Sequence, residues 1–327
     1  MAAPSVISPG AVDGVDGMHG AAARPRARSA RGGRPGRTAR LLRLPFYLLA
    51  VTMIIPFYWM VITVFKPFQE ITRQPPSFVP ANPRLTSFYD PAWTPAQPDP
   101  AHTSGLLQRF PQVSLGFWRF MINSLVITTS ITVLALLVCS LAGYVIAKHR
   151  IPGRRVIFIV IIASMMVPWQ TTLIPNYVIM RNLGWLSTYQ GYIVPAIAKA
   201  FVVFFLVQYL HSIPNELIHA ARVDGAGEWR IWWKIVLPLL RPALAAMSIF
   251  IVLAEWNNFL WPLIIVQSDG MANIPVALAR MNSYYVGAQS QGAIMAGALL
   301  ASLPTIVFFL IFQRHFTRGI VLSGLKG

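Results

Sequence analysis

The chain alternates between long apolar intervals and shorter segments that carry most of its basic residues. A membrane-spanning helix needs about 20 consecutive, mostly apolar residues. Six intervals reach this length, and two of them are interrupted by a single charge, at Lys199 and at Glu255. The six lie between Arg43 and Lys66, Arg119 and Lys148, Arg155 and Arg181, Tyr189 and Leu210, Ala243 and Val266, and Ala293 and Gln313. This pattern predicts an all-α integral membrane protein with six transmembrane helices.

The distribution of Lys and Arg predicts which side of the membrane each connection faces, because cytoplasmic loops accumulate these residues. Of the 27 basic residues, 19 fall in the N-terminal tail, the second loop, the fourth loop and the C-terminal tail. These four segments share one side of the membrane when six helices cross it. Both termini are therefore predicted to lie in the cytoplasm.

Composition supports a bilayer as the surrounding solvent. Apolar residues make up 55% of the chain and charged residues 11%, whereas a soluble domain carries roughly 25% charged residues. The net charge of +17 is typical of some nucleic-acid-binding proteins, but here most basic residues lie in the tails and in alternate loops between the predicted spans. The Arg-rich segment 1–43 is predicted to be disordered, and it has no aromatic residue for base stacking. We therefore expect no nucleic-acid partner; a translation start at Met18 remains open.

These boundaries divide the chain into a cytoplasmic tail, a membrane domain and a second tail. The predicted parts are 1–43, 44–313 and 314–327, with an external loop at about 66–120, a cytoplasmic loop at about 211–241 and a second external loop at about 267–292. The first external loop is rich in proline and aromatic residues. A docking surface and a passive extension explain that composition equally well.

The cytoplasmic loop at 211–241 is predicted to form a helix–turn–helix. Ser212 is a suitable N-cap for the first helix, because a serine hydroxyl accepts a hydrogen bond from a free backbone N–H. Leu217, Ala220 and Ala221 then share one helical face. Gly225 follows as a turn residue, since glycine adopts the positive φ that ends a helix. Small alanines on such a loop allow another protein to approach closely.

The same loop carries a motif of two alanines, a glycine four residues after the second alanine, and Ile-x-Leu-Pro that begins ten residues after the glycine. Its positions are Ala220, Ala221, Gly225, Ile235, Leu237 and Pro238. This spacing resembles the EAA motif of bacterial ABC-importer permeases, and Asp224 before Gly225 resembles its carbohydrate branch. The resemblance implies that the loop docks on a separate ATPase subunit and transmits its closure. His219 stands where that family has Glu; we expect it at this interface as a neutral hydrogen-bonding residue.

Three further stretches extend the resemblance over residues 44–327. Residues 256–263 are similar to a segment of maltose-type permeases, 319–327 to the C-terminal tail of a MalG-like subunit, and 269–291 to the external scoop that enters a binding protein. The implied partners are a MalF-like second permease, two ABC ATPase subunits and an extracytoplasmic sugar-binding protein. The implied location is the prokaryotic cytoplasmic (inner) membrane. ATP and magnesium are expected on the ATPase, with no cofactor in this chain.

Polar residues inside the predicted spans are candidates for a translocation path, because a charge at the bilayer centre costs about 2.5 to 3.5 kcal/mol. Lys199 and Glu255 either pair with each other or find separate partners, or Glu255 lines the path with Asn257 and Asn258. Trp256 and Trp261 are able to stack on sugar rings or to anchor at the membrane interface, and the second role is favoured for Trp261.

Several chemistries are not predicted. The sequence contains no G-x-x-x-x-G-K-[ST] phosphate loop, no catalytic triad or carboxylate pair in a water-exposed segment, and no cluster with metal-ligand spacing. We therefore expect no catalytic or metal-binding residue and no enzymatic activity in this chain. Two alternatives to the importer hypothesis remain: an ion-coupled secondary transporter with a Glu255–Lys199 proton relay, and a non-transporting membrane scaffold.

Overall fold

The computed structural model describes residues 44–89, 106–108, 116–284 and 291–324. The predicted tail 1–43 and the last three residues lie outside these ranges. The chain divides into two compact units, residues 1–52 and 53–327. In the first unit, the described residues are the beginning of helix α2 (Leu44–Val64). Apart from α2, which contains the boundary between the units, every element discussed below belongs to the second unit.

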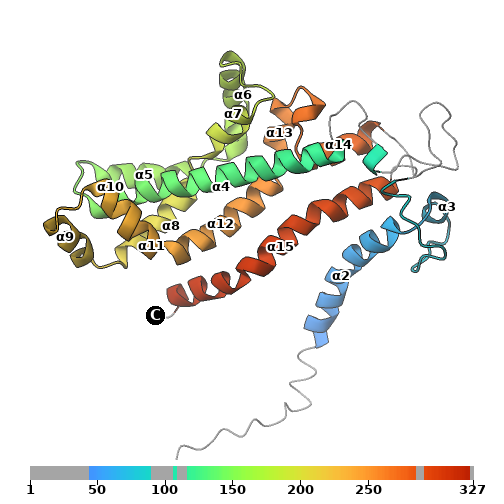
Figure 1. The fold of residues 1–327 in the computed structure, drawn as a ribbon, viewed down its shortest axis with the longest axis horizontal. Helices are drawn as coiled ribbons and strands as arrows, with labels where there is room; N and C mark the ends of the chain where they lie inside the picture. The colour runs from blue at the N-terminus through green and yellow to red at the C-terminus, as the bar shows by residue number, and fades with distance from the viewer. Residues whose placement is uncertain (1–43, 90–105, 109–115, 285–290, 325–327) are drawn as a thin grey trace, which may run out of the picture. The chain divides into compact units, whose positions relative to one another are not determined.

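Regular structure in the described ranges is entirely helical (Figure 1). The longer helices of the second unit are α4 (Phe117–Lys148), α5 (Arg154–Ser164), α6 (Leu173–Asn182), α8 (Ala200–His211), α9 (Asn215–Val223), α12 (Arg241–Trp256), α14 (Ile274–Tyr284) and α15 (Gln291–Gly324). The short ones are α3 (Phe68–Ile71), η1 (Leu106–Gln108), η2 (Trp169–Thr172), α7 (Tyr189–Ile193), η3 (Val194–Ala196), α10 (Glu228–Ile231), η4 (Trp232–Val236), α11 (Leu237–Leu239), α13 (Leu260–Ile265) and η5 (Asp269–Met271).

Among the described residues, three helices are long and apolar enough to cross a membrane: 45–64 in α2, α4, and 291–312 in α15. Three more crossings arise if each of three sharply bent helix pairs counts as one. The all-helical membrane fold is therefore confirmed, with three to six crossings. The cytoplasmic position of the termini remains a prediction.

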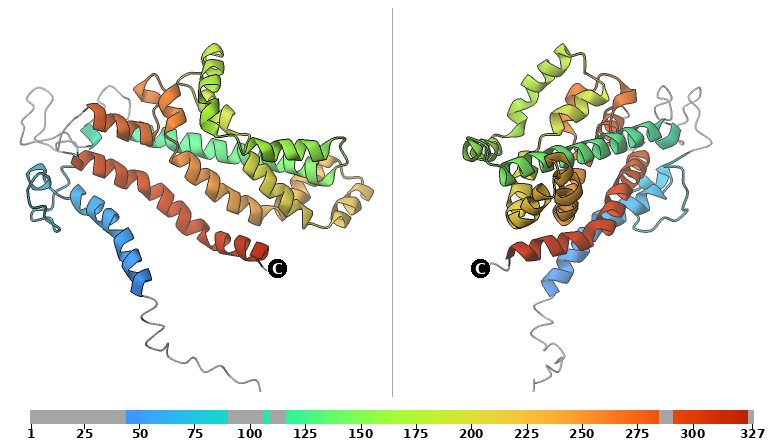
Figure 2. Two further views of the ribbon diagram at one scale, coloured as in Figure 1. Left: turned by 180° about the vertical axis from the view of Figure 1, so that it is seen from behind. Right: turned by 60° about the vertical axis from the view of Figure 1, so that its left-hand side comes forward.

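Helix α4 is the centre of the packing. It lies against α8 and α12, and α12 also lies against α15. Gly143 of α4 faces α8, since a Cβ at this position would meet Leu206 and Leu210 at 3.5 Å, an ordinary contact distance. In all three views α4 runs the length of this group of helices, while α6 stands away from it (Figures 1 and 2). This arrangement makes α4 the element that joins the two ends of the unit.

The predicted spans differ from the observed helices in continuity. The interval 155–181 breaks after α5, with a turn of 94° into η2 and α6, at Pro168. The interval 189–210 bends by 44° between η3 and α8. The interval 243–266 is also not one helix, because α12 ends at Trp256 and α13 begins at Leu260. Hydropathy averages over such breaks, since it measures how apolar a segment is and not whether its backbone hydrogen bonds are continuous.

Both predicted external loops are folded where they are described. In the first, the carboxylate of Glu70 accepts hydrogen bonds from Ser77 Oγ and from the N–H of Ala81. The second contains α14, and its Asn273 is buried and donates a hydrogen bond to the carbonyl of Asn258. At the other end of the chain, α15 continues to Gly324, well into the predicted tail 314–327.

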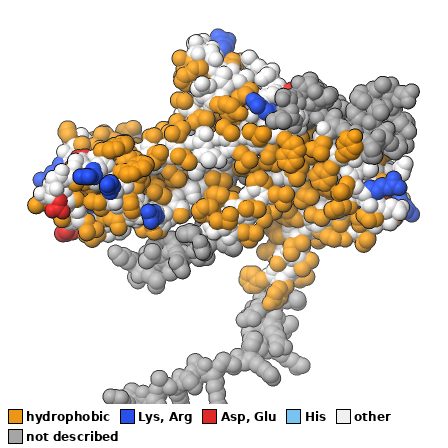
Figure 3. All heavy atoms as spheres, viewed as in Figure 1, with side chains coloured by type: hydrophobic (Ala, Val, Ile, Leu, Met, Phe, Trp, Pro, Cys, Tyr) orange, Lys and Arg blue, Asp and Glu red, His pale blue; other side chains and the backbone are white. Residues whose placement is uncertain are grey.

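Hydrophobic side chains cover much of the face shown in Figure 3, and basic side chains gather at the end that carries α9 and α10. The exposed apolar residues include most of those on α5 and most of those between Leu303 and Ile311 on α15. A water-soluble protein rarely exposes so large an apolar surface. This surface suits contact with lipid or with another membrane subunit.

Candidate functional site

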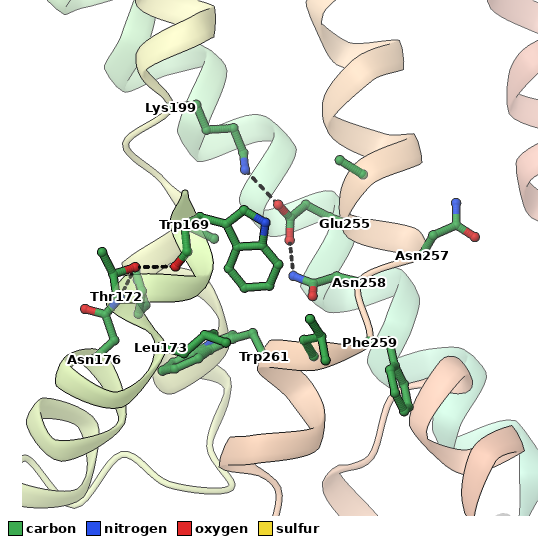
Figure 4. Close-up of a pocket in the computed structure, with 14 residues that line it drawn as sticks. Trp169, Thr172, Leu173, Asn176, Lys199, Glu255, Asn257, Asn258, Phe259 and Trp261 are labelled. Atoms are coloured by element: carbon green, nitrogen blue, oxygen red, sulfur yellow. Dashed lines mark hydrogen bonds and ion pairs between the residues drawn. The ribbon is translucent and has the colours of Figure 1, made fainter. Parts of the chain in front are cut away.

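A cavity of about 620 Å³ lies where α6, α8, α12 and α13 meet (Figure 4). This volume falls within the range of roughly 300 to 1,000 Å³ that is usual for small-molecule sites. Fourteen residues line the cavity. They come from the breaks found in three of the predicted spans: Trp169, Thr172, Leu173 and Asn176; Pro195, Ala196 and Lys199; and Ala254, Glu255, Asn257, Asn258, Phe259, Leu260 and Trp261.

An ion pair stands at the polar side of the cavity. Lys199 Nζ lies 2.7 Å from Glu255 Oε1, and Asn258 donates from Nδ2 to Glu255 Oε2 at 3.2 Å. The Glu255 side chain is 8% exposed and that of Lys199 23%. Lys199 and Glu255 thus pair with each other, which was the first alternative, and both line the cavity (Figure 4). That this cavity belongs to a translocation path remains a prediction.

The end of α12 explains why Glu255 and Asn258 meet. Asn257 is the C-cap residue of the helix, and the N–H of Asn258 donates to the carbonyl of Glu255. This turn brings the Asn258 amide back toward the carboxylate. Asn257 itself is exposed and donates to the carbonyl of Leu253. In Figure 4 its amide points away from the ion pair, although the residue lines the cavity.

Aromatic residues form another part of the wall, and of the two predicted tryptophans Trp261 is among them but Trp256 is not. Trp256 is buried and absent from the lining, since its Nε1 donates to the carbonyl of Ala301 on α15 at 3.0 Å. Trp261 does line the cavity; it is buried and donates to the carbonyl of Gly191, so it is not an exposed interfacial anchor. Trp169 and the half-buried Phe259 complete the aromatic surface.

Sequence reasoning missed the contribution of η2 and α6. Trp169, Thr172 and Asn176 lie inside the predicted span 155–181, where they were treated as ordinary membrane residues. The available signal was Pro168, which stands two residues before the polar run Gln170 to Thr172. Non-helical backbone at membrane depth is tolerated only where it lines a cavity or is buried in protein, so a break at this proline indicates such a place.

The second candidate region is the segment from α9 to α11. Gly225 lies between α9 and α10 with φ of 78°, a conformation that glycine adopts without the steric strain of a side chain. The prediction for Ser212 was wrong. Its hydroxyl and its N–H both donate to the carbonyl of Tyr209, so Ser212 ends α8, and α9 begins at Asn215 after Pro214.

The three residues predicted to share one face of α9, Leu217, Ala220 and Ala221, are not equally exposed. Ile218 and Ala221 are buried, whereas Leu217 and Ala220 are exposed. His219 is exposed beside Ala220. The three-residue spacing from Ile218 to Ala221 follows the helical period, and so does the spacing of Leu217, Ala220 and Ala221. The sequence pattern therefore does not decide which of these residues are buried; the element that packs against α9 does. Of the remaining motif residues, Asp224 and Gly225 are exposed, and Ile235, Leu237 and Pro238 are half-buried.

A polar cluster joins this segment to the end of α4. Glu228 Oε2 accepts a hydrogen bond from Tyr144 Oη at 2.6 Å and lies 3.1 Å from His149 Nε2. Its other oxygen lies 2.7 Å from Arg222 Nε. The hydrogen bond with Glu228 is also the main reason why the pKa of Arg222 is raised. Beside this cluster, Lys148 Nζ donates to the carbonyl of Ile213 and to Asn215 Oδ1.

Residues 139–322 match the family described as "binding-protein-dependent transport system inner membrane component". The arabinooligosaccharides transport system permease protein AraQ of Halalkalibacterium halodurans is 38% identical over 211 residues, which are 64% of this chain and 75% of that protein. The sn-glycerol-3-phosphate transport system permease protein UgpE of Escherichia coli O1:K1 / APEC is 34% identical over 210 residues, again 64% of this chain and 75% of that protein.

One solved structure has the same fold. It is a chain in the crystal structure of a bacterial ABC transporter involved in the import of the acidic polysaccharide alginate. The match has a TM-score of 0.72 and covers 87% of this chain and 99% of that one, at 21% sequence identity. Together with the family match and the curated relatives, it identifies the architecture. The chain therefore belongs to the family of binding-protein-dependent transport system inner membrane components, and it is a multi-pass permease subunit of an ABC importer in the cytoplasmic membrane.

Proposed function

We propose that this permease translocates a sugar or oligosaccharide that an extracytoplasmic binding protein delivers. Its other partners are a second permease and two ATPase subunits, which hold ATP and Mg²⁺, so this chain needs no cofactor. The solutes named for AraQ and for the alginate transporter are glycans, and that named for UgpE is a phosphorylated polyol. Hydroxyl-rich solutes are therefore common among its relatives.

The cavity is the observation that carries this proposal. A sugar ring has apolar C–H faces and a rim of hydroxyl groups. The cavity offers aromatic surface from Trp169, Phe259 and Trp261 beside the amides of Asn176 and Asn258. Such a combination of apolar wall and few polar groups is typical of small-molecule sites. Glu255, Asn257 and Asn258 thus belong to the proposed path, and Trp256 supports the wall from behind.

The segment from α9 to α11 is proposed to receive the movement of the ATPase. The exposed His219 and Ala220 offer a contact surface at the end of the molecule, and the turn at Gly225 sets the angle between the two helices. The Glu228 cluster then transfers displacement to Tyr144 on α4. Because α4 packs against α8 and α12, the displacement reaches the helices that position Lys199 and Glu255.

Paired proline substitutions test this coupling. Gly225 has φ of 78°, which proline cannot adopt, and its N–H donates to the carbonyl of Arg222. Gly227 has φ of −68°, close to the value that proline imposes. We expect Gly225→Pro to reduce co-purification of the ATPase subunits and ATP-driven sugar uptake in proteoliposomes by about tenfold or more. Gly227→Pro, two residues away, is expected to retain both.

Uptake that proceeds without the ATPase subunits would contradict the proposal and favour a secondary transporter. Co-purification of partners without solute-stimulated ATP hydrolysis would favour a scaffold. His219→Ala tests the finer role of this position: a hydrogen bond to the ATPase predicts weaker ATPase stimulation by the loaded binding protein. Unchanged stimulation would remove His219 from the interface.

A further inference from the structure

The charge balance of the cavity suggests a narrower substrate class than sugars in general. Among the fourteen residues that line it, Lys199 is the one cation and Glu255 the one anion. Their charged atoms are 2.7 Å apart, so the lining has no net charge and its cation already has a partner. The relatives named above include importers of acidic alginate and of a phosphate ester. The solutes of these relatives therefore leave open whether this chain transports charged or uncharged solutes.

We propose that the cavity accepts an uncharged glycan and rejects an anionic one. An anionic group entering this space has to displace the Glu255 carboxylate from Lys199 or remain without a cationic partner. It would also bring a second negative charge close to Glu255, which is unfavourable where little water remains. A neutral solute meets neither penalty, because its hydroxyl groups are able to donate to Glu255 and to accept from the amides.

The geometry around the pair shows how it resists opening. Asn258 donates to the oxygen of Glu255 that faces away from Lys199, so both carboxylate oxygens have partners. Asn258 is in turn held by Asn273, which donates to its backbone carbonyl at 2.8 Å. Rotation of Glu255 toward another cation therefore breaks two contacts. The Asn176 amide, by contrast, makes one long contact of 3.5 Å with Thr172 Oγ1 and is available to a solute hydroxyl.

This inference rests on the proposed function, and its test does not involve ATP-driven uptake. The permease assembly, without its binding protein, is placed in lipid nanodiscs and titrated by calorimetry with maltose, cellobiose and galactobiose. The matching diuronates, in which each CH₂OH is a carboxylate, form the second series. We expect the wild type to bind at least one neutral disaccharide about tenfold more tightly than its diuronate, which is the ordinary size of a charge-assisted hydrogen bond.

Variants test whether the Lys199–Glu255 ion pair causes the preference for neutral disaccharides. Glu255→Gln leaves Lys199 without its carboxylate partner, and it is expected to shift the ratio of affinities toward the diuronate by about tenfold. Asp269→Asn is the matched control, because it removes a carboxylate from the Asp269–Arg280 pair outside the cavity. It is expected to leave the ratio unchanged. The exchange Lys199→Glu with Glu255→Lys restores a neutral lining and is expected to keep the wild-type preference.

Three results would overturn the inference: equal or tighter binding of the diuronates by the wild type, an unchanged ratio in Glu255→Gln, or binding of none of the six probes. If Glu255→Gln does not accumulate, the inference is still tested by the ratio of neutral-disaccharide to diuronate affinity in the wild type and in the exchange variant. Each of these results leaves the proposed function standing if ATP-driven uptake of a sugar is observed. Absence of any ATP-driven uptake is the separate result that removes the proposed function.

Discussion

Two carboxylates of this permease, Glu255 in the cavity and Glu228 at the start of α10, are each paired with a cation at 2.7 Å. Their surroundings differ. Glu255 is 8% exposed and has one cation and one amide as partners, whereas Glu228 is 48% exposed and has Arg222, His149 and Tyr144 around it. The number of partners is therefore greater where water already solvates the charge. Burial, rather than the count of contacts, should decide how much each pair contributes.

The physical reason lies in the cost of an unpaired charge. Removing one member of a buried ion pair leaves the other without water or partner, at a cost of about 3 to 5 kcal/mol. Exposed pairs usually contribute about 0 to 1 kcal/mol, because water replaces the lost partner. The cavity pair thus constrains the charge of what enters, and the Glu228 cluster mainly constrains the geometry of α9 and α10 relative to α4.

The largest effect is expected for Lys199→Met. It leaves the Glu255 carboxylate unpaired and is expected to destabilise the fold by about 3 kcal/mol, at the low end of the range for buried pairs since Lys199 is partly exposed. The double variant with Glu255→Leu is expected to recover most of this loss. Thermal unfolding in detergent measures this loss of stability. The Tm of the single variant is expected to fall by about 5 to 10 °C. A double variant as unstable as the single one would show that the pair is not coupled.

A smaller effect is expected for Arg222→Ala in the Glu228 cluster. Arg222 and Glu228 are both partly exposed, so the loss should be about 1 kcal/mol or less and should shrink in high salt. Thermal unfolding at low and at high sodium chloride measures this difference. A loss equal to that of Lys199→Met, or one that salt does not change, would mean that exposure does not separate the two regions.

The smallest effect is expected at Glu70, a carboxylate of the external segment that has hydrogen-bond donors but no ion pair at contact distance among the described residues. Its pKa is lowered from 4.5, first by the hydrogen bond from Ser77 and then by that from Ala81. A lowered pKa in the folded state means that its contribution is present above about pH 4.5 and is lost as the pH falls through the folded-state value. The Tm advantage of the wild type over Glu70→Gln should therefore be small at pH 7 and should decrease as the pH falls below about 4.5. An advantage that grows in acid would contradict this sign.

The amino-acid sequence determined the class of the protein and its most local features. Charge-free apolar intervals predict membrane helices because the bilayer cannot solvate backbone or charge. The turn at Gly225 was predictable, because positive φ favours glycine regardless of what surrounds it. Lys199 and Glu255 stood out as functional candidates for the same local reason, since a charge in an apolar interval is costly wherever it lies.

Tertiary structure alone decided which candidates share a site. Trp256 and Trp261 look equivalent in sequence. Trp256 donates a hydrogen bond to the Ala301 carbonyl on α15 and does not line the cavity, whereas Trp261 donates to the Gly191 carbonyl and does line it. Trp169 and Asn176 joined the site because the chain turns by 94° beside Pro168. Periodicity and hydropathy describe a segment by itself, whereas these placements depend on hydrogen-bond partners and breaks that distant segments supply.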